Sequence, residues 1–258
     1  MARRDLLAQI ERGAHDNRSD LVSLLRRCIT LGGITGSESL REWANRQLTG
    51  YGDGVDLPDY RKAAAPLMLD AHVPGARITG QQVPYTLIPD FARDDLGDDI
   101  DFRQPIYEIA EMLSSARRRG ETTVKLGVPL GSGVVALMND ELRRGSQPQV
   151  IERIYWDVSL VPLTRILDAV RTRLVALIAE MRAGTPAGHT LPTREVTEQA
   201  VGIAIHGRGH RIVIQQDSPG AAASVGETGG ESGARGVAFW ILVVATVVAA
   251  VAAVVVLF

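Results

Sequence analysis

The chain has 258 residues, and 28 lysines and arginines nearly balance 30 aspartates and glutamates, so its formal net charge is −2. A near-neutral chain excludes the broad basic surface of general nucleic-acid-binding proteins, so we expect no strong nucleic-acid binding. A single cysteine excludes a framework of disulfides, because each bridge needs two thiols. That residue, Cys28, lies on an apolar helical stripe and is interpreted as a small buried hydrophobe rather than a nucleophile.

The N-terminal part of the chain carries the spacing of amphipathic helices. Apolar residues recur every three or four positions over 6–14, 21–29 and 37–48. Ser19 is a suitable N-cap for the second of these helices, and the glycine pair that begins at Gly32 is expected to end it. The pattern therefore predicts two antiparallel helices followed by a third.

Farther along the chain, apolar residues alternate with others instead. The runs 67–73 and 83–88 favour two strands around a Gly-containing turn, which predicts a small sheet. Pro105 suits the first turn of a helix whose apolar face lies within 106–113. A shorter helix is expected over 134–144.

The most regular helix of the chain is predicted after a strand at 150–158. Between Leu163 and Met181, apolar residues return at three- and four-residue spacing. Such a stripe is typical of a helix in a protein core. The part of the chain before residue 186 is thus predicted to be a predominantly helical α+β domain with a small β-sheet.

The remaining residues have a different character. Residues 186–216 are interpreted as a linker, within which 203–215 suggests a β-hairpin around a Gly-containing turn. Residues 217–236 are rich in Gly, Ala and Ser and have little to bury, so we expect a flexible tether. Residues 237–258 carry no charge and reach roughly 33 Å as a helix, enough to cross the ~30 Å hydrocarbon core of a bilayer. A single transmembrane helix is predicted there.

One span near the C-terminus predicts a tail-anchored protein with its N-terminal domain in the cytoplasm. The start of the chain has no apolar stretch of the length of a secretory signal, and Arg235 before the span agrees with the positive-inside rule. Within the span, Ala245, Ala249 and Ala253 repeat every fourth residue, which would let two helices approach closely in a homo-oligomer. A segment this rich in Ala and Val also produces such a repeat by chance.

Catalytic and metal-binding motifs are mostly absent. The sequence lacks GxxxxGK[ST], GxSxG, HExxH and a paired CxxC. His206 and His210 flank glycines in an expected turn, where their spacing does not bring two imidazoles to one metal. The acidic run 90–101 lacks the ordered spacing of a calcium loop and is interpreted as a solvated loop, whereas His72 is expected to face a neighbour or solvent. We therefore expect no metal and no cofactor.

Residues 42–61 contain a combination of residue types that helix and turn formation alone would not require. A helix that carries Glu-Trp ends at Gly-Tyr and is followed by Leu-Pro-Asp-Tyr-Arg; the residues are Glu42, Trp43, Leu48, Gly50, Tyr51, Leu57, Pro58, Asp59, Tyr60 and Arg61. This combination resembles the AbiTii domain of bacterial abortive-infection proteins over about residues 3–185. One departure is Gln47, which stands where the family pattern is usually acidic. The resemblance assigns no catalytic residue to this chain.

The motif residues also have a structural interpretation. The rings of Trp43, Tyr51 and Tyr60 would pack the end of the helix onto the sheet, because aromatic side chains with polar tips commonly close such corners. Arg61 would then pair with Glu42 or Asp59.

The resemblance implies a component of anti-phage defence, which the apolar tail would place at the bacterial inner membrane. Two modes of action stay open. In the first, the chain is a sensor or effector that acts by binding and assembly, with 1–190 recognising an unknown phage or host protein and 237–258 in the bilayer. In the second, it is a membrane-tethered hydrolase- or nuclease-like toxin that gathers Asp and His side chains from distant parts of the chain. The missing motifs favour the first mode.

Overall fold

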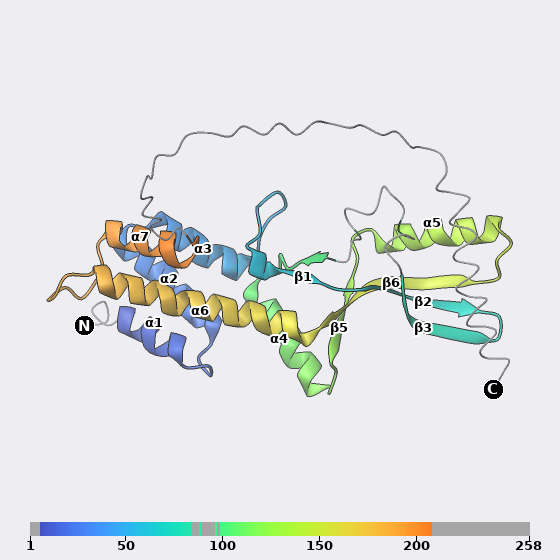
Figure 1. Ribbon diagram of the computed structural model, residues 1–258, viewed down its shortest axis with the longest axis horizontal. Coiled ribbons are helices and arrows are strands. Elements are labelled where there is room, and N and C mark those ends of the chain that lie inside the picture. Colours follow the sequence, from blue (N-terminus) through green and yellow to red (C-terminus); the bar gives the residue numbers. More distant parts are fainter. Residues whose placement is uncertain (1–5, 84–87, 89–95, 97–98, 208–258) are drawn as a thin grey trace, which may run out of the picture. The chain divides into compact units, whose positions relative to one another are not determined.

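In the computed structural model, the described residues are 6–83, 88, 96 and 99–207 (Figure 1). They divide into two compact units, and each unit is assembled from separate stretches of the chain. Among the described residues, unit 1 takes 6–63, 101–124 and 159–207, and unit 2 takes those within 64–100 together with 125–158.

Unit 1 is built mainly of helices. In chain order they are α1 (Leu6–His15), α2 (Leu21–Thr35), α3 (Glu38–Thr49), η2 (Asp59–Arg61), α4 (Ile106–Arg118), α6 (Leu160–Gly184) and α7 (Arg194–Ala204). Helix α6 is central, since α1, α4, α7 and η2 all contact it. Most of its predicted apolar stripe is buried, namely Leu163, Ile166, Val170, Leu174, Leu177, Ile178 and Met181, and Leu167 of the same stripe is half-buried. The core helix expected from the sequence is confirmed.

Helix α2 runs farther than predicted. Its N-cap is Asp20 rather than Ser19, and the Asp20 carboxylate accepts two backbone N–H groups of the first turn. Gly32 lies inside the helix, where its missing side chain admits α3, because an added Cβ would lie 2.7 Å from Arg41 Cγ. The helix ends instead at Gly36, whose φ of 76° is left-handed.

Cys28 lies on the core side of α2 and is fully buried. Burial raises the pKa of its thiol to about 12, so the thiol is protonated at neutral pH. Because the thiolate is the reactive form of cysteine, this environment makes Cys28 a poor nucleophile. The interpretation of Cys28 as a buried hydrophobe agrees with the structure.

Unit 2 contains a four-stranded sheet in the order β3-β2-β6-β5, in which β2 runs antiparallel to both of its neighbours. The strands are β2 (Leu67–Val73), β3 (Ala76–Gln82), β5 (Thr123–Gly127) and β6 (Val150–Ser159). Two further strands, β1 (Lys62–Ala64) and β4 (Asp99–Asp101), form a two-stranded sheet. This arrangement confirms the predicted α+β class with a small sheet.

Helix α5 (Gly131–Arg144) packs against β6 (Figure 1). At its start, a Cβ added to Gly131 would lie 3.8 Å from Ile154 Cγ1. Farther along, the Asn139 side chain donates to the Ile151 carbonyl oxygen and accepts from the Ile151 amide, both at 2.8 Å. Ile151 and Ile154 are buried, so one face of the sheet is the apolar face of unit 2.

Two predicted strands are confirmed and a third is corrected. The ranges 67–73 and 150–158 correspond to β2 and β6. The hairpin partner of β2 is β3, over 76–82, rather than the predicted run 83–88, of which 84–87 lie outside the described residues.

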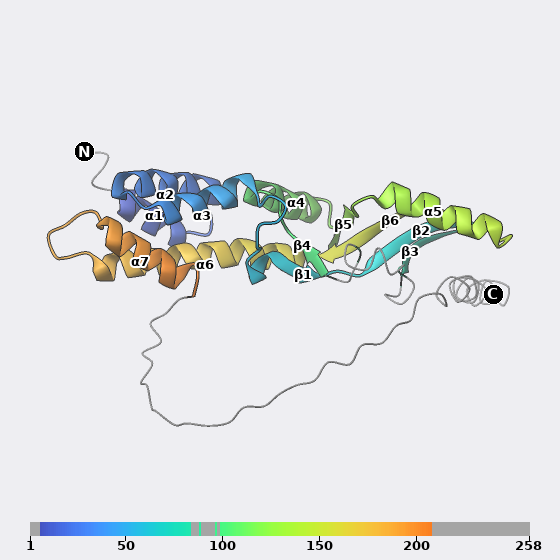
Figure 2. The same cartoon turned by 90° about the horizontal axis from the view of Figure 1, so that it is seen from above.

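The linker predicted over 186–216 contains helix α7 (Figure 2). Thr193 caps it, because its Oγ1 accepts from the Val196 amide, and Ala200 and Val201 are buried on one face. The first strand of the expected hairpin is therefore replaced by the end of a helix, and 208–215 lie outside the described residues. The helical spacing of small and apolar residues outweighs the short alternation that suggested a strand.

The predicted transmembrane segment, 237–258, and the predicted tether before it lie outside the described residues. Among the helices that are described, none combines the length and the apolar character that a membrane crossing requires.

Candidate functional site

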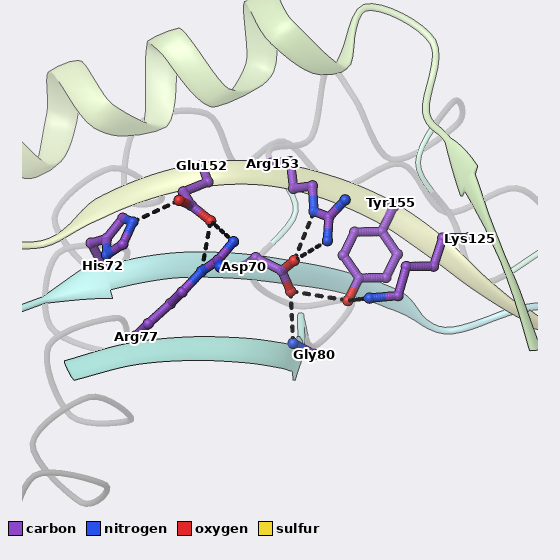
Figure 3. Close-up of polar contacts among 8 residues, drawn as sticks. All are labelled: Asp70, His72, Arg77, Gly80, Lys125, Glu152, Arg153 and Tyr155. Atoms are coloured by element: carbon purple, nitrogen blue, oxygen red, sulfur yellow. Dashed lines mark hydrogen bonds and ion pairs between the residues drawn. The ribbon is translucent and has the colours of Figure 1, made fainter.

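Polar side chains from all four strands gather on one face of the unit 2 sheet (Figure 3). We call this cluster the polar face; it consists of Asp70, His72, Arg77, Gly80, Lys125, Glu152, Arg153 and Tyr155. Neighbouring residues of a strand point to opposite faces. Since Ile154 is on the apolar face, Arg153 and Tyr155 on either side of it point away from α5.

A β-bulge brings two adjacent charged residues of β6 to this face. The pairing with β2 shifts just after Asp70, and Glu152 is the extra residue. The buried Ile151 and Ile154 therefore stand three positions apart, and Glu152 and Arg153 between them are both exposed. Without the bulge, strict alternation would direct one of these two charged side chains towards the apolar face. The extra residue keeps both of them on the polar face.

A second bulge directs a backbone amide at Asp70. The β2–β3 pairing shifts between Leu69 and Ala71, and opposite this shift Gly80 has a left-handed φ of 68°. Glycine is the residue that adopts this conformation without steric cost. The Gly80 N–H donates to Asp70 Oδ1 at 2.8 Å.

Asp70 is the buried anchor of the polar face, with no exposed surface. Its Oδ1 also accepts from the Tyr155 hydroxyl at 3.0 Å, and its Oδ2 accepts from Arg153 Nε at 2.7 Å and Nη2 at 2.6 Å. Burial raises the pKa of Asp70, but the hydrogen bonds from Gly80, Arg153 and Tyr155 outweigh it and hold the pKa below its ordinary value. Asp70 is therefore ionised at neutral pH.

Two cations flank the buried ring of Tyr155. Lys125 Nζ donates to the Tyr155 hydroxyl at 3.1 Å and lies 4.5 Å from the ring centroid. The Arg153 guanidinium lies 5.2 Å from the same centroid. Within the residues that the structure describes, Lys125 forms no ion pair with a carboxylate.

Glu152 joins a second pair of residues on the same face. Its Oε1 accepts from His72 Nε2 at 2.6 Å, and its Oε2 accepts from Arg77 Nη2 at 2.7 Å. The hydrogen bond from Arg77 is the main cause of a lowered pKa at Glu152, opposed by desolvation and assisted by His72. The His72 side chain is 56% exposed, so it faces both a neighbour and solvent.

The chemistry of the polar face is that of paired charges. The carboxylates of Asp70 and Glu152 are paired with the side chains of Arg153 and Arg77. No set of three His, Cys, Asp or Glu side chains in the described ranges could hold a metal ion. A histidine held by a carboxylate, as His72 is by Glu152, is the arrangement that orients a general base.

The sequence motif lies elsewhere, in unit 1 at the end of α3. Gln47 is buried, and its Nε2 donates to the hydroxyls of Tyr51 and Tyr60. The Tyr60 ring packs under Arg173 of α6, whose guanidinium lies 4.1 Å from the ring centroid. The tyrosines therefore close the end of α3 as expected, and Tyr60 contacts helix α6.

Arg61 is the fully buried centre of this motif. Its Nη2 donates to Gln47 Oε1 at 2.6 Å, and its Nη1 donates to the carbonyl oxygens of Phe102 at 3.1 Å and Gln104 at 2.7 Å. Burial lowers the pKa of Arg61, opposed by the two tyrosines beside it. The guanidinium thus holds the segment before α4 against the end of α3.

The predicted ion pair of Arg61 is wrong. Glu42 is exposed and pairs with Arg46 one turn along α3, and Asp59 is also exposed. Arg61 instead uses the neutral amide of Gln47, because its side chain points into the core, where the carboxylates would be desolvated. The other motif residues divide in the same way: Trp43, Tyr51, Leu57 and Tyr60 are buried, whereas Leu48 and Pro58 are half-buried.

Substitution of Gly50, at the end of α3, is expected to lower the stability of unit 1 measurably. Its φ is 87°, and an added Cβ would lie 2.7 Å from the Arg103 carbonyl oxygen. We expect Gly50→Ala to destabilise unit 1 by about 2–4 kcal/mol, because backbone strain and a backbone clash add. Hydrogen exchange of α3 measures the effect. The matched control is Gly52→Ala, since a Cβ there meets nothing within 4 Å; equal effects of the two changes would contradict the prediction.

Two other groups considered from the sequence remain untested. His206 follows α7, but His210 lies outside the described residues. Of the acidic run 90–101, Asp99 and Asp101 belong to β4, and most of the remaining run is also outside the described residues.

Comparison with known proteins identifies the family. The AbiTii family model matches residues 5–204. No curated protein and no solved structure matches the chain. The matched range extends beyond the predicted 3–185, so it includes α7 as well as the motif of unit 1 and the polar face of unit 2. Because the match covers well over half of its length, the chain belongs to the AbiTii family of abortive-infection proteins.

Proposed function

We propose that this protein is a membrane-anchored component of a bacterial anti-phage abortive-infection system and that it acts by binding and assembly. Membership of the AbiTii family is the observation that carries the defence role. The uncharged run 237–258 supports anchoring in the inner membrane, because roughly 33 Å of helix exceeds the ~30 Å hydrocarbon core. The N-terminal domain then lies in the cytoplasm, where phage and host proteins are accessible.

The contacts of the polar face support binding rather than catalysis. Asp70 and Glu152 both have pKa values below the ordinary range, so each is a weak base that stays ionised at neutral pH. General acid–base catalysis favours groups whose pKa lies near the working pH. Asp70 is in addition enclosed by its four donors, which leaves it the role of an anchor.

A membrane-tethered enzyme is the second candidate, and the pair of His72 and Glu152 favours it. If His72 is a general base, His72→Ala abolishes protection against phage, since no other imidazole belongs to the polar face. If the face acts by binding, the same change has a small effect, because Arg77 and Arg153 keep their partners. The efficiency of phage plating distinguishes the two outcomes.

The anchoring prediction is tested in bacteria that express three forms of the chain. These are the full chain, a chain that ends at Gly236, and a chimera in which 237–258 is replaced by an unrelated uncharged helix of equal length. We expect protection from the first and third but not from the second, because placement at the bilayer is what the tail supplies. Equal protection by the chain ending at Gly236 would remove the membrane from the mechanism.

Association of copies through the tail is part of the proposed mode of action. Ala245, Ala249 and Ala253 would lie on one side of the helix, where small side chains permit close approach. Ala249→Ile is expected to reduce self-association in a membrane-dimer assay. Ala250→Ile is the matched control on another side of the helix, and unchanged association in both variants would exclude this interface.

A further inference from the structure

We propose that the polar face of unit 2 binds phosphate-bearing anions through Arg77, Lys125 and Arg153. These cations come from β3, β5 and β6 and extend over one face of the same sheet (Figure 3). At a strand spacing of about 4.8 Å, the four strands span about 14 Å. A ligand with several phosphate groups therefore reaches more of these cations than a single phosphate does.

The guanidinium groups of Arg77 and Arg153 are each fixed by a carboxylate, but only part of their hydrogen-bonding capacity is used. Arg153 binds Asp70 through Nε and Nη2, and Arg77 binds Glu152 through the same two nitrogens. In the described part of the chain, Nη1 of neither arginine makes a hydrogen bond or an ion pair. Each side chain is 54% exposed, so each presents a fixed, charged edge to solvent. Guanidinium edges of this kind suit phosphate oxygens.

Lys125 adds a charge that no described carboxylate neutralises. Its ammonium group rests on the buried Tyr155 ring and donates to the Tyr155 hydroxyl, which in turn donates to Asp70. A side chain that is already positioned loses less conformational entropy when it binds a ligand. The exposed Lys125 thus completes a set of three preorganised cations.

The balance of charge on this face favours an anion. Among the residues of the polar face, the three cationic side chains of Arg77, Lys125 and Arg153 stand against the two carboxylates of Asp70 and Glu152. Asp70 is fully buried, so Glu152 is the carboxylate that an incoming anion would meet. Glu152→Gln removes this repulsion and keeps an oxygen that can accept from Arg77, so it should tighten binding rather than weaken it.

The chain supplies its own matched control for the test. It has two lysines, Lys62 and Lys125, and both are exposed. The full chain in neutral detergent is acetylated with acetic anhydride, and the rate at each lysine is followed by mass spectrometry with and without sodium tripolyphosphate at constant ionic strength. We expect tripolyphosphate to slow acetylation of Lys125 about fivefold, as about 80% occupancy would, and to leave Lys62 unchanged.

Soluble phosphates and lipid headgroups share this chemistry, and a second arm distinguishes them. The same rates are measured with vesicles of phosphatidylcholine alone and with vesicles that contain phosphatidylglycerol. Slower acetylation of Lys125 with phosphatidylglycerol identifies headgroups as a source of the ligand, and slowing with tripolyphosphate alone identifies a soluble one. Unchanged Lys125 rates in both arms would overturn the proposal.

Variants test whether the cations act together. Arg77→Ala should weaken the protection of Lys125, and Glu152→Gln should strengthen it. Arg118→Ala is the control, since Arg118 is an exposed arginine that pairs with Glu111 in unit 1. If neither Arg77→Ala nor Glu152→Gln alters the protection, Lys125 acts alone and the proposed site is wrong. The acetylation experiment measures anion binding without phage. A negative result therefore does not affect the proposed defence role, and a failure of the phage-plating experiment does not affect the result on anion binding.

Discussion

Arg61→Ala is expected to destabilise unit 1 by about 3–5 kcal/mol. The substitution empties the space of a fully buried side chain and removes three hydrogen bonds at once. The carbonyl oxygens of Phe102 and Gln104 then lose a charged donor, and each buried acceptor left unpaired costs about 1–3 kcal/mol. These costs overlap, so they do not add in full.

Two companion variants show which property of Arg61 matters. Arg61→Met fills part of the volume without the charge, so it should recover the cavity cost but leave the acceptors unpaired. Arg46→Ala is the surface control, because Arg46 pairs with the exposed Glu42 one turn away in α3. Hydrogen exchange of α3 and α4 in urea reports on unit 1 separately. A loss below about 1 kcal/mol for Arg61→Ala would contradict the role given to this guanidinium.

Asp70→Ala is expected to destabilise unit 2 by about 2–4 kcal/mol. It leaves the buried Tyr155 hydroxyl and the Gly80 amide without their acceptor, whereas the half-exposed Arg153 can be hydrated. Asp70→Asn should cost less, because its amide oxygen still accepts one of these bonds. Hydrogen exchange of β2 and β6 measures both effects, and equal losses for the two variants would mean that packing rather than hydrogen bonding dominates.

The same carboxyl predicts how unit 2 responds to acid. The pKa of Asp70 in the folded chain is below its value in the unfolded chain, about 3.9. Its contribution to stability is therefore complete above that unfolded value and is lost as the pH falls through the folded pKa. Asp70→Asn should flatten this loss of stability in acid. If the wild type and the variant lose stability in parallel, another group controls acid unfolding.

Long elements with a buried face could be predicted from the sequence. In α6, the predicted stripe from Leu163 to Met181 is buried except for the half-buried Leu167, because one apolar side of a helix leaves a regular signal. Strands β2 and β6 were predicted for a related reason, since both lie inside the sheet and carry apolar residues.

Edge elements escaped prediction because their side chains carry no such signal. Strand β3 (ARITGQQ) lies at the edge of the sheet and is largely exposed on both faces, so nothing in it alternates. The run 83–88 is more apolar, so the sequence favours it as the partner of β2. Strand β5 lies at the opposite edge and is only five residues long, which is too short for its alternation to stand out in the sequence.

The polar face could not be predicted, because its contacts depend on strand register. Asp70 and Arg153 are far apart in the sequence and meet through the β2–β6 pairing. The bulge at Glu152 determines which charges share a face, and a bulge changes the pattern by a single residue. In the motif, the aromatic residues were found, but the partner of Arg61 was not, since Gln47 is neutral and pairs by hydrogen bonding.

In the described part of the chain, two separate stretches belong to unit 2, one within 64–100 and the other 125–158. The central strands β2 and β6 belong to different stretches, so the four-stranded sheet is incomplete until the second has left the ribosome. During synthesis, β2 and β3 are made before β6 and can pair only with each other. An isolated two-stranded hairpin is at best marginally stable in water. No single proteolytic cut separates the two units, and a messenger truncated after residue 124 would yield an unpaired β2 edge prone to aggregation.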